Sequence, residues 1–219
     1  MNNKFFDAAK EKQDRIINAA LQVFAVNGYR HASTDEIVRI AGISKGLLFH
    51  YFGSKLGLYS FLYDYSTKFM RLELSRDTEG IQTDYFTLKR GVETARMRVY
   101  RKYPYMRRFL DGAEREDCVE AMEAVEALRM EYGEWMRALM ERADYRVLER
   151  KADLVRAVKA IDYTLEGVTE EYSLRPDYTP EGLYEEIMAC LDMFERLFAP
   201  DEAGKRAEEK MEEQAEQPG

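Results

Sequence analysis

Apolar residues recur with the period of an α-helix along almost the whole chain, and this spacing limits the fold more than any other feature. Only five prolines and thirteen glycines interrupt the 219 residues. Segments in which apolar and polar residues alternate, as they do in half-buried strands, are scarce. We therefore predict an all-α protein.

Glycine and serine positions divide this pattern into separate helices. Ser33 has the features of an N-cap because Glu36 follows it three residues later, which is the spacing of a capping box. Gly28 stands where a first helix should stop, since glycine adopts a left-handed backbone at little cost. With such boundaries the expected helices span residues 7–27, 34–41, 44–52, 54 to beyond 69, 84–103, 105–112, 117–142, 145–172 and 180–198.

Charge is distributed unevenly along the sequence. The formal net charge is −8, yet residues 1–55 hold eight basic and five acidic residues and carry a net charge of +3. The remaining 25 basic and 36 acidic residues give −11. The N-terminal quarter is thus the part of the chain suited to a polyanionic partner.

Several classes of protein are not expected from this composition. Cys118 and Cys190 are isolated, with no disulfide framework and no zinc spacing, which is typical of reduced thiols in a cytoplasmic protein. We find no signal sequence and no apolar segment long enough to cross a bilayer. With only His31 and His50, no glycine-rich phosphate loop and no clustered carboxylates, we expect no enzyme activity, no metal and no cofactor.

Residues 34–52 have the pattern of a helix-turn-helix: a short helix, a turn containing glycine, and a second short helix. The second helix lies within the stretch GISKGLLFHYFGSK, residues 42–55. At 100° per residue, Leu48, Phe49 and Phe52 fall on one side of this helix. Gly46, Leu47, His50 and Tyr51 fall on the other side. We expect the first group to pack inward and the second to face a partner.

The outward group and its flanks suit the major groove of DNA. Gly46 allows a close approach of the helix, while Tyr51 and His50 offer rings with polar tips. Ser44 and Lys45 lie at the helix N-terminus, where backbone N–H groups favour anions. Lys55 and Thr34 are expected to contact phosphates at the edges of this surface. An alternative is a helical protein-interaction module whose helix-turn-helix no longer reads DNA, a reading that the apolar Leu47 favours.

From Arg15 to Tyr59 the chain resembles the DNA-binding region of the TetR (tetracycline repressor) family of bacterial transcription regulators. The resemblance is carried by RIINAALQVFAVNGY and STDEIVRIAGISKGLLFHYFGSKLGLY, in one ungapped register. It departs from the family at Leu47, where a polar residue is common, so that a thymine methyl contact would replace a hydrogen bond. The resemblance implies DNA contacts from Thr34, Ser44, Lys45, Gly46, His50, Tyr51 and Lys55.

The resemblance also implies the domain organisation and the mode of action. Residues 1–53 would form the DNA-binding domain, 54–200 a helical effector-binding and dimerisation domain, and 201–219 a polar, disordered tail. The protein would be a homodimer that binds a palindromic operator, most simply as a repressor, and leaves it when a small-molecule effector binds. Candidate residues of the effector pocket are Tyr63, Tyr100, Tyr103, Phe109, Met130, Trp135 and Tyr163, all of which could equally be core residues.

The last two expected helices carry apolar seams with alternating steps of four and three residues. Such seams suit antiparallel helix packing, either inside one chain or between the two subunits of a four-helix dimer interface. The seam residues are Leu154, Val158, Ile161, Leu165, Val168, Tyr172, Leu183, Ile187, Cys190, Phe194 and Leu197.

A basic run lies between residues 89 and 108, KRGVETARMRVYRKYPYMRR, with eight basic residues and one acidic residue. It could bind an anionic effector or pair with the acidic segment 114–117. We expect a solvated or salt-bridged face instead, because exposed charges are usually arranged in this way.

Overall fold

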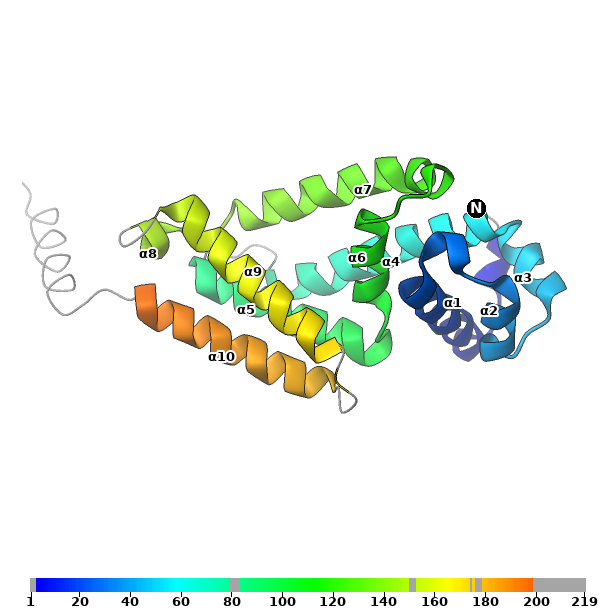
Figure 1. The fold of residues 1–219 in the computed structure, drawn as a ribbon, viewed down its shortest axis with the longest axis horizontal. Coiled ribbons are helices and arrows are strands. Elements are labelled where there is room, and N and C mark those ends of the chain that lie inside the picture. The colour runs from blue at the N-terminus through cyan, green and yellow to red at the C-terminus, as the bar shows by residue number, and fades with distance from the viewer. Residues whose placement is uncertain (1–2, 79–82, 150–152, 174, 176–178, 199–219) are drawn as a thin grey trace, which may run out of the picture. The chain divides into compact units, whose positions relative to one another are not determined.

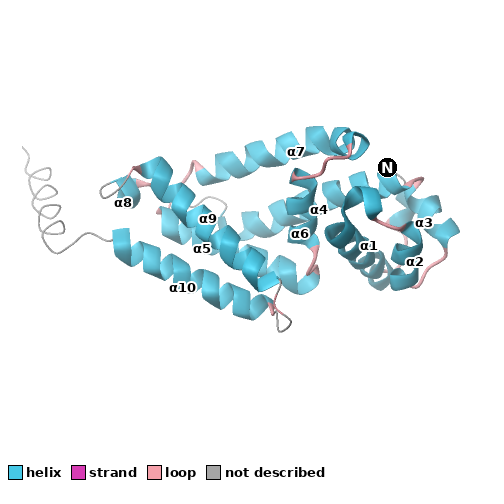
Figure 2. Cartoon of the chain, in the orientation of Figure 1, coloured by secondary structure: helices cyan, strands magenta, loops and turns pink. Residues whose placement is uncertain are grey.

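The structure is a computed structural model, and it describes residues 3–78, 83–149, 153–173, 175 and 179–198. Over these ranges every regular element is a helix, which confirms the predicted all-α class (Figures 1 and 2). A short 3-10 helix, η1 (Asn3–Phe5), comes first. It is followed by α1 (Lys10–His31), α2 (Thr34–Ala41), α3 (Lys45–Phe52), α4 (Lys55–Thr78), α5 (Tyr85–Lys102), α6 (Met106–Glu114), α7 (Val119–Met140), α8 (Arg146–Glu149), α9 (Leu154–Ser173) and α10 (Pro180–Phe198).

Most helix boundaries follow the local signals in the sequence, with two differences. Helix α1 is broken at Gly28 (φ 66°, ψ 176°) as predicted, but one further helical turn follows and ends at His31. The single helix expected over 145–172 is two helices, because Asp153 accepts a hydrogen bond from the Arg156 N–H at 3.1 Å and so caps a new start. The expected tail, 201–219, lies outside the described residues.

The chain divides into two compact units, residues 1–79 with 94–141 and residues 80–93 with 142–219. Helix α5 contributes its first part to the second unit and its last part to the first. The proposed boundary between residues 53 and 54 stays a prediction. In the first unit α1 packs against α2, α4 and α6, and α4 packs against α6 and α7. No helix among the described residues is long and apolar enough to span a membrane.

In the second unit α9 and α10 pack along each other (Figure 1). Ile161, Leu165, Leu183 and Ile187 are at most 5% exposed, so these four predicted interface residues belong to the core of a single chain. The physical reason is that the seam of each helix is covered by the other helix. The large apolar side chains exposed on the described parts of these two helices are Val155, Tyr163, Met193 and Leu197, of which only Leu197 was predicted to face a second subunit.

The basic run 89–108 forms ion pairs with acidic residues of its own unit. Lys89 pairs with Asp162, and Arg90 bridges Asp192 and Glu195. In the first unit Arg98 pairs at 3.1 Å with Glu73, whose side chain is only 9% exposed, and Arg107 pairs with Asp111. The salt-bridged interpretation of this run is therefore confirmed for these residues.

A buried tyrosine that directly follows α5 joins α1 and α4 in the first unit. The Tyr103 hydroxyl donates to Asp14 Oδ1 on α1 at 2.7 Å and lies 2.7 Å from the Tyr65 hydroxyl on α4. Burial, followed by these two hydrogen bonds, raises the pKa of Tyr103. Burial also raises the pKa of Tyr85 and brings that of Tyr132 to about 12. These phenols are therefore held in their neutral form by the fold.

We expect alkaline pH to unfold the protein through these tyrosines. A pKa that is higher in the folded than in the unfolded chain contributes stability that is complete below pH about 10 and falls as the pH rises further. Phenolate absorbance should therefore increase in two steps, and the second should coincide with loss of the helical circular dichroism signal. Ionisation of every tyrosine before any loss of helix would contradict this expectation.

Candidate nucleic-acid interface

Two serine caps and one glycine fix the start and end of α2 and the start of α3. Ser33 Oγ accepts from the Glu36 N–H at 3.5 Å, and Ser44 Oγ accepts from the Leu47 N–H at 3.2 Å. Gly42 ends α2 in the left-handed conformation (φ 65°, ψ 44°), and its own N–H bonds to the Val38 carbonyl. Because each cap acts within three or four residues, the turn geometry follows from the local sequence.

Helix α3 has one buried side and one exposed side, as the helical wheel predicts. Leu48 is 1% exposed. Gly46 and His50 are exposed, and Leu47 and Tyr51 are half-buried. A Cβ atom added at Gly46 would meet no atom within 4 Å, so that the backbone of α3 is accessible at this position. Phe49 is half-buried, and its ring is thus less completely inside than we expected.

An aromatic cluster supports α3 from the N-terminal end of the chain. Phe5, which is 1% exposed, packs its ring 5.5 Å from that of Tyr51, 5.1 Å from that of Phe52 and 5.1 Å from that of Phe61. Phe52 and Phe61 are 4.9 Å apart. Tyr51 therefore presents only part of its ring outward. The pair Phe5-Phe6 in an otherwise polar N-terminal segment was the sequence signal for this contact.

The polar residues at the N-terminal end of α3 remain available to an anion. Ser44 is exposed, and Thr34 is half-buried at the start of α2. The Lys45 ammonium lies 2.9 Å from Asp35 Oδ1, with side chains 50% and 72% exposed. An ion pair this exposed contributes at most about 1 kcal/mol, so a phosphate can displace Asp35 from Lys45.

Lys55 has a different role from the predicted phosphate contact. Its Nζ donates to the carbonyl oxygens of Tyr29, Arg30 and Ala32 at 2.7, 3.3 and 3.2 Å, and it lies 4.5 Å from the centre of the Tyr29 ring. An ammonium has three donors, and all three are used here. Lys55 thus holds the C-terminal end of α1 and is not placed as a free cation. A positive charge in the first turn of a helix is unfavourable because that end of the helix dipole is also positive. The position of Lys55 at the start of α4 therefore indicated that its ammonium has acceptors elsewhere.

The residues proposed for an effector pocket lie partly in the core and partly on the surface, and the pocket itself stays a prediction. Tyr63, Tyr100, Tyr103 and Phe109 are at most 3% exposed. Tyr63 and Tyr100 hydrogen-bond to Glu114 and Arg107 respectively. Phe109 packs 5.4 Å from Tyr59, and Trp135 stacks on Tyr132 in α7. Met130 and Tyr163 are 57% and 66% exposed. Their helical spacing does not distinguish an inner from an outer face.

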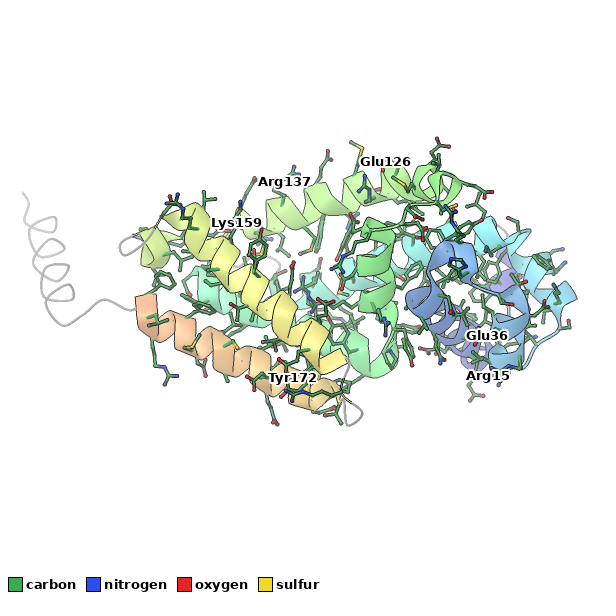
Figure 3. All side chains as sticks on the ribbon, viewed as in Figure 1. Arg15, Glu36, Glu126, Arg137, Lys159 and Tyr172 are labelled. Carbon is green, nitrogen blue, oxygen red and sulfur yellow. The ribbon has the colours of Figure 1, made fainter. Side chains whose placement is uncertain are left out.

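A groove in the first unit has a volume of about 440 Å³ and contains none of these residues. Its walls come from α1, α2, the end of α5 and the segment between α5 and α6, and Arg15 on α1 marks its position in Figure 3. The lining residues are Arg15, Asn18, Ala19, Gln22, Ile40, Arg101, Lys102, Pro104 and Tyr105.

The site geometry coincides with the part of the chain that matches a known protein family. Residues 16–60 match the model of the tetR family of bacterial regulatory proteins. Over 56 residues the chain is 43% identical to an uncharacterized HTH-type transcriptional regulator, TtgW, of Pseudomonas putida, covering 26% of this chain and 42% of that protein. Over 49 residues it is 45% identical to the HTH-type transcriptional activator FasR of Mycolicibacterium smegmatis, covering 22% of each chain. The matched region thus spans less than half the length of these relatives.

The likeness extends further in three dimensions. The fold resembles that of PfmR, a TetR-family transcriptional regulator from Thermus thermophilus, with a TM-score of 0.58 and 25% sequence identity. This similarity covers 83% of the present chain and 97% of PfmR, including the helices that follow the helix-turn-helix. Residues 16–60 of the chain thus match the tetR family of bacterial regulatory proteins, and the helical fold resembles that of a TetR-family regulator.

Proposed function

We propose that the protein is a sequence-specific DNA-binding transcriptional regulator in which α3 enters the major groove. The main observation is the two-sided character of α3: Leu48 is buried, while Gly46 and His50 are exposed beside the N-terminal Ser44 and Lys45. Side chains and N–H groups at the helix start would hold phosphates, and the exposed face would meet base edges. Leu47 would then contact a thymine methyl group.

The active form is proposed to be a homodimer on a palindromic operator. Support comes from Val155, Tyr163, Met193 and Leu197, which leave apolar surface exposed on α9 and α10. Burying this surface against a second copy would form a four-helix interface with two-fold symmetry. A two-fold dimer would place its recognition helices in successive major grooves, so half-sites should be separated by about one helical turn or a multiple of it.

The proposed mode of action is repression that is relieved by a small molecule. A dimer across two major grooves would exclude other proteins from the same DNA. An effector that binds about 100-fold more tightly to a dimer with wrongly spaced recognition helices would shift the equilibrium by about 2.7 kcal/mol. FasR is named an activator, so a reporter gene under the selected operator should decide the direction of regulation.

The function can be tested with DNA selected from a randomised pool by the full-length protein. We expect enriched sequences with inverted half-sites, and binding that weakens steeply between about 50 and 200 mM salt. A variant with His50→Ala and Tyr51→Ala should lose at least about tenfold in affinity. A matched control with Arg137→Ala on α7 (Figure 3) should bind as the wild type does.

The same experiment distinguishes DNA binding from the alternative function, in which the helix-turn-helix binds another protein. Apolar association between proteins depends weakly on salt, whereas binding to phosphates releases counterions. If no sequence is enriched at low salt, and if the wild type and the double variant bind DNA equally, sequence-specific DNA binding by α3 is excluded.

A further inference from the structure

The segment between α6 and α7, residues 115–118, is attached to the end of α1 within the first unit. The Tyr29 N–H donates to Glu116 Oε2 at 2.8 Å. Asp117 pairs with Arg30 at 3.7 Å, and the Tyr29 hydroxyl donates to Glu120 at 3.4 Å. The central contact is the one at Glu116, because it is short and joins residues 87 positions apart in the sequence.

The break in α1 explains why the Tyr29 amide needs this partner. At Gly28 the backbone leaves helical geometry (φ 66°, ψ 176°), so the N–H that follows is turned away from the helix ladder. Tyr29 is only 6% exposed, and a buried N–H without an acceptor would cost free energy. The Glu116 carboxylate supplies the acceptor in a charge-assisted hydrogen bond, which is stronger than a neutral one.

The same carboxylate also organises the start of α7. Glu116 Oε1 accepts from the N–H groups of Asp117 and Cys118 at 3.2 and 3.1 Å. Cys118 occupies the N-cap position of α7 without a side-chain cap of its own. One oxygen atom of Glu116 is therefore bonded to the beginning of α7 and the other to the end of α1.

The segment 28–32 is held from its other side by α4. The Lys55 ammonium binds the carbonyls of Tyr29, Arg30 and Ala32, while Glu116 binds the Tyr29 amide. Ser33, the N-cap of α2, follows at once. The direction in which the chain enters the helix-turn-helix is thus set by two charged residues, one before α7 and one in α4.

We propose that Glu116 is a positioning residue for DNA binding and that it connects the arrangement of α6 and α7 to the orientation of α2 and α3. This proposal rests on the proposed function of α3. Among the described residues Glu116 hydrogen-bonds to Tyr29, Asp117 and Cys118 and not to α2 or α3, so it would act through Tyr29. A molecule that displaces segment 115–118 would free the Tyr29 amide, loosen the end of α1 and weaken DNA binding without occupying the DNA-binding surface.

The first experiment measures the connection without DNA. Hydrogen exchange of the Tyr29 and Cys118 amides is compared in wild type, Glu116→Ala, Glu116→Gln and Glu126→Gln. Glu126 lies on α7 and pairs with Arg129, so its substitution is a matched control (Figure 3). We expect exchange at both amides to accelerate about tenfold or more in Glu116→Ala. Glutamine retains one acceptor oxygen, so Glu116→Gln should protect one amide and expose the other. Unchanged exchange at Tyr29 in Glu116→Ala would overturn the proposal.

The second experiment measures DNA binding on a selected operator. Glu116→Ala should weaken binding about tenfold with the same salt slope as the wild type, since no phosphate contact is removed.

The effect must also be reciprocal: DNA should slow exchange at Cys118 in the wild type but not in Glu116→Ala. If Glu116 only stabilised the fold, its replacement would lower stability but DNA would still slow exchange at Cys118. Slower exchange at Cys118 with DNA in Glu116→Ala therefore counts against the proposal. If the wild type binds no DNA, the proposed function of α3 is refuted. If the wild type binds DNA and Glu116→Ala binds it with equal affinity, only the role of Glu116 is refuted.

Discussion

Replacing Gly57 with alanine is expected to destabilise the protein by about 2–4 kcal/mol, an effect in the range of severe overpacking. A Cβ atom at this position would lie 2.1 Å from the carbonyl oxygen of Phe52 and 3.3 Å from its carbon. These are backbone atoms at the end of α3, so neither can move without displacing that helix. The gain in helix propensity, about 1 kcal/mol for glycine to alanine, is too small to offset this clash.

Urea unfolding followed by circular dichroism measures this loss of stability directly. Gly133→Ala on α7 is the matched control, because a Cβ there would meet no atom within 4 Å. That variant should be as stable as the wild type or more stable by up to about 1 kcal/mol. A Gly57→Ala protein with wild-type stability would mean that α3 and α4 approach each other less closely than described.

Replacing Gly46 with leucine should have the opposite result: a stable protein that no longer binds its operator. Gly46 is exposed in the first turn of α3 and a side chain there would meet no protein atom within 4 Å. Leucine also favours the helix, so stability should be unchanged or about 1 kcal/mol higher. If α3 lies in the major groove, however, the added side chain fills the space between backbone and base edges. We expect affinity for the operator to fall about 100-fold, towards the non-specific level.

Binding by fluorescence anisotropy and unfolding by urea should be measured on the same preparation. Gly133→Leu adds the same side chain to an exposed glycine of α7 and should leave DNA binding intact. Gly46→Ala should lie between wild type and Gly46→Leu, because its methyl group fills less of the gap. Wild-type affinity in Gly46→Leu would show that this face of α3 does not meet DNA.

Features that depend on neighbours in the sequence were predictable. The caps at Ser33 and Ser44 act across three residues, and the left-handed Gly42 ends α2 by local backbone geometry. The division of α3 into two sides followed from its helical period alone, and Leu48 confirms it. The helix start after Asp153 also had a local signal, because a capping residue precedes an apolar helix. We nevertheless predicted one continuous helix there, since the apolar seam that follows is long.

Features that depend on distant partners could not be read from the sequence. Lys55 is recognisable as a cation, but its carbonyl acceptors lie 23 to 26 residues earlier in the chain. The acceptor of the Tyr29 amide, Glu116, belongs to an acidic segment without any local motif. Likewise, the seam at Ile161 and Leu183 indicates that each helix has an apolar side, but periodicity does not say which neighbour covers it.

The packing of Phe5 against Tyr51 and Phe52 has a practical consequence for handling the protein. An affinity tag fused ahead of residue 3 would join the chain close to Phe5, whose ring packs against α3, and would compete for the space beside that helix. A shortened protein that starts at Ala8 would lack the Phe5 ring and would leave Phe61 without one of its partners. Binding constants measured on such preparations would describe a differently supported α3, so any tag should be removed and Phe5 retained before affinities are compared.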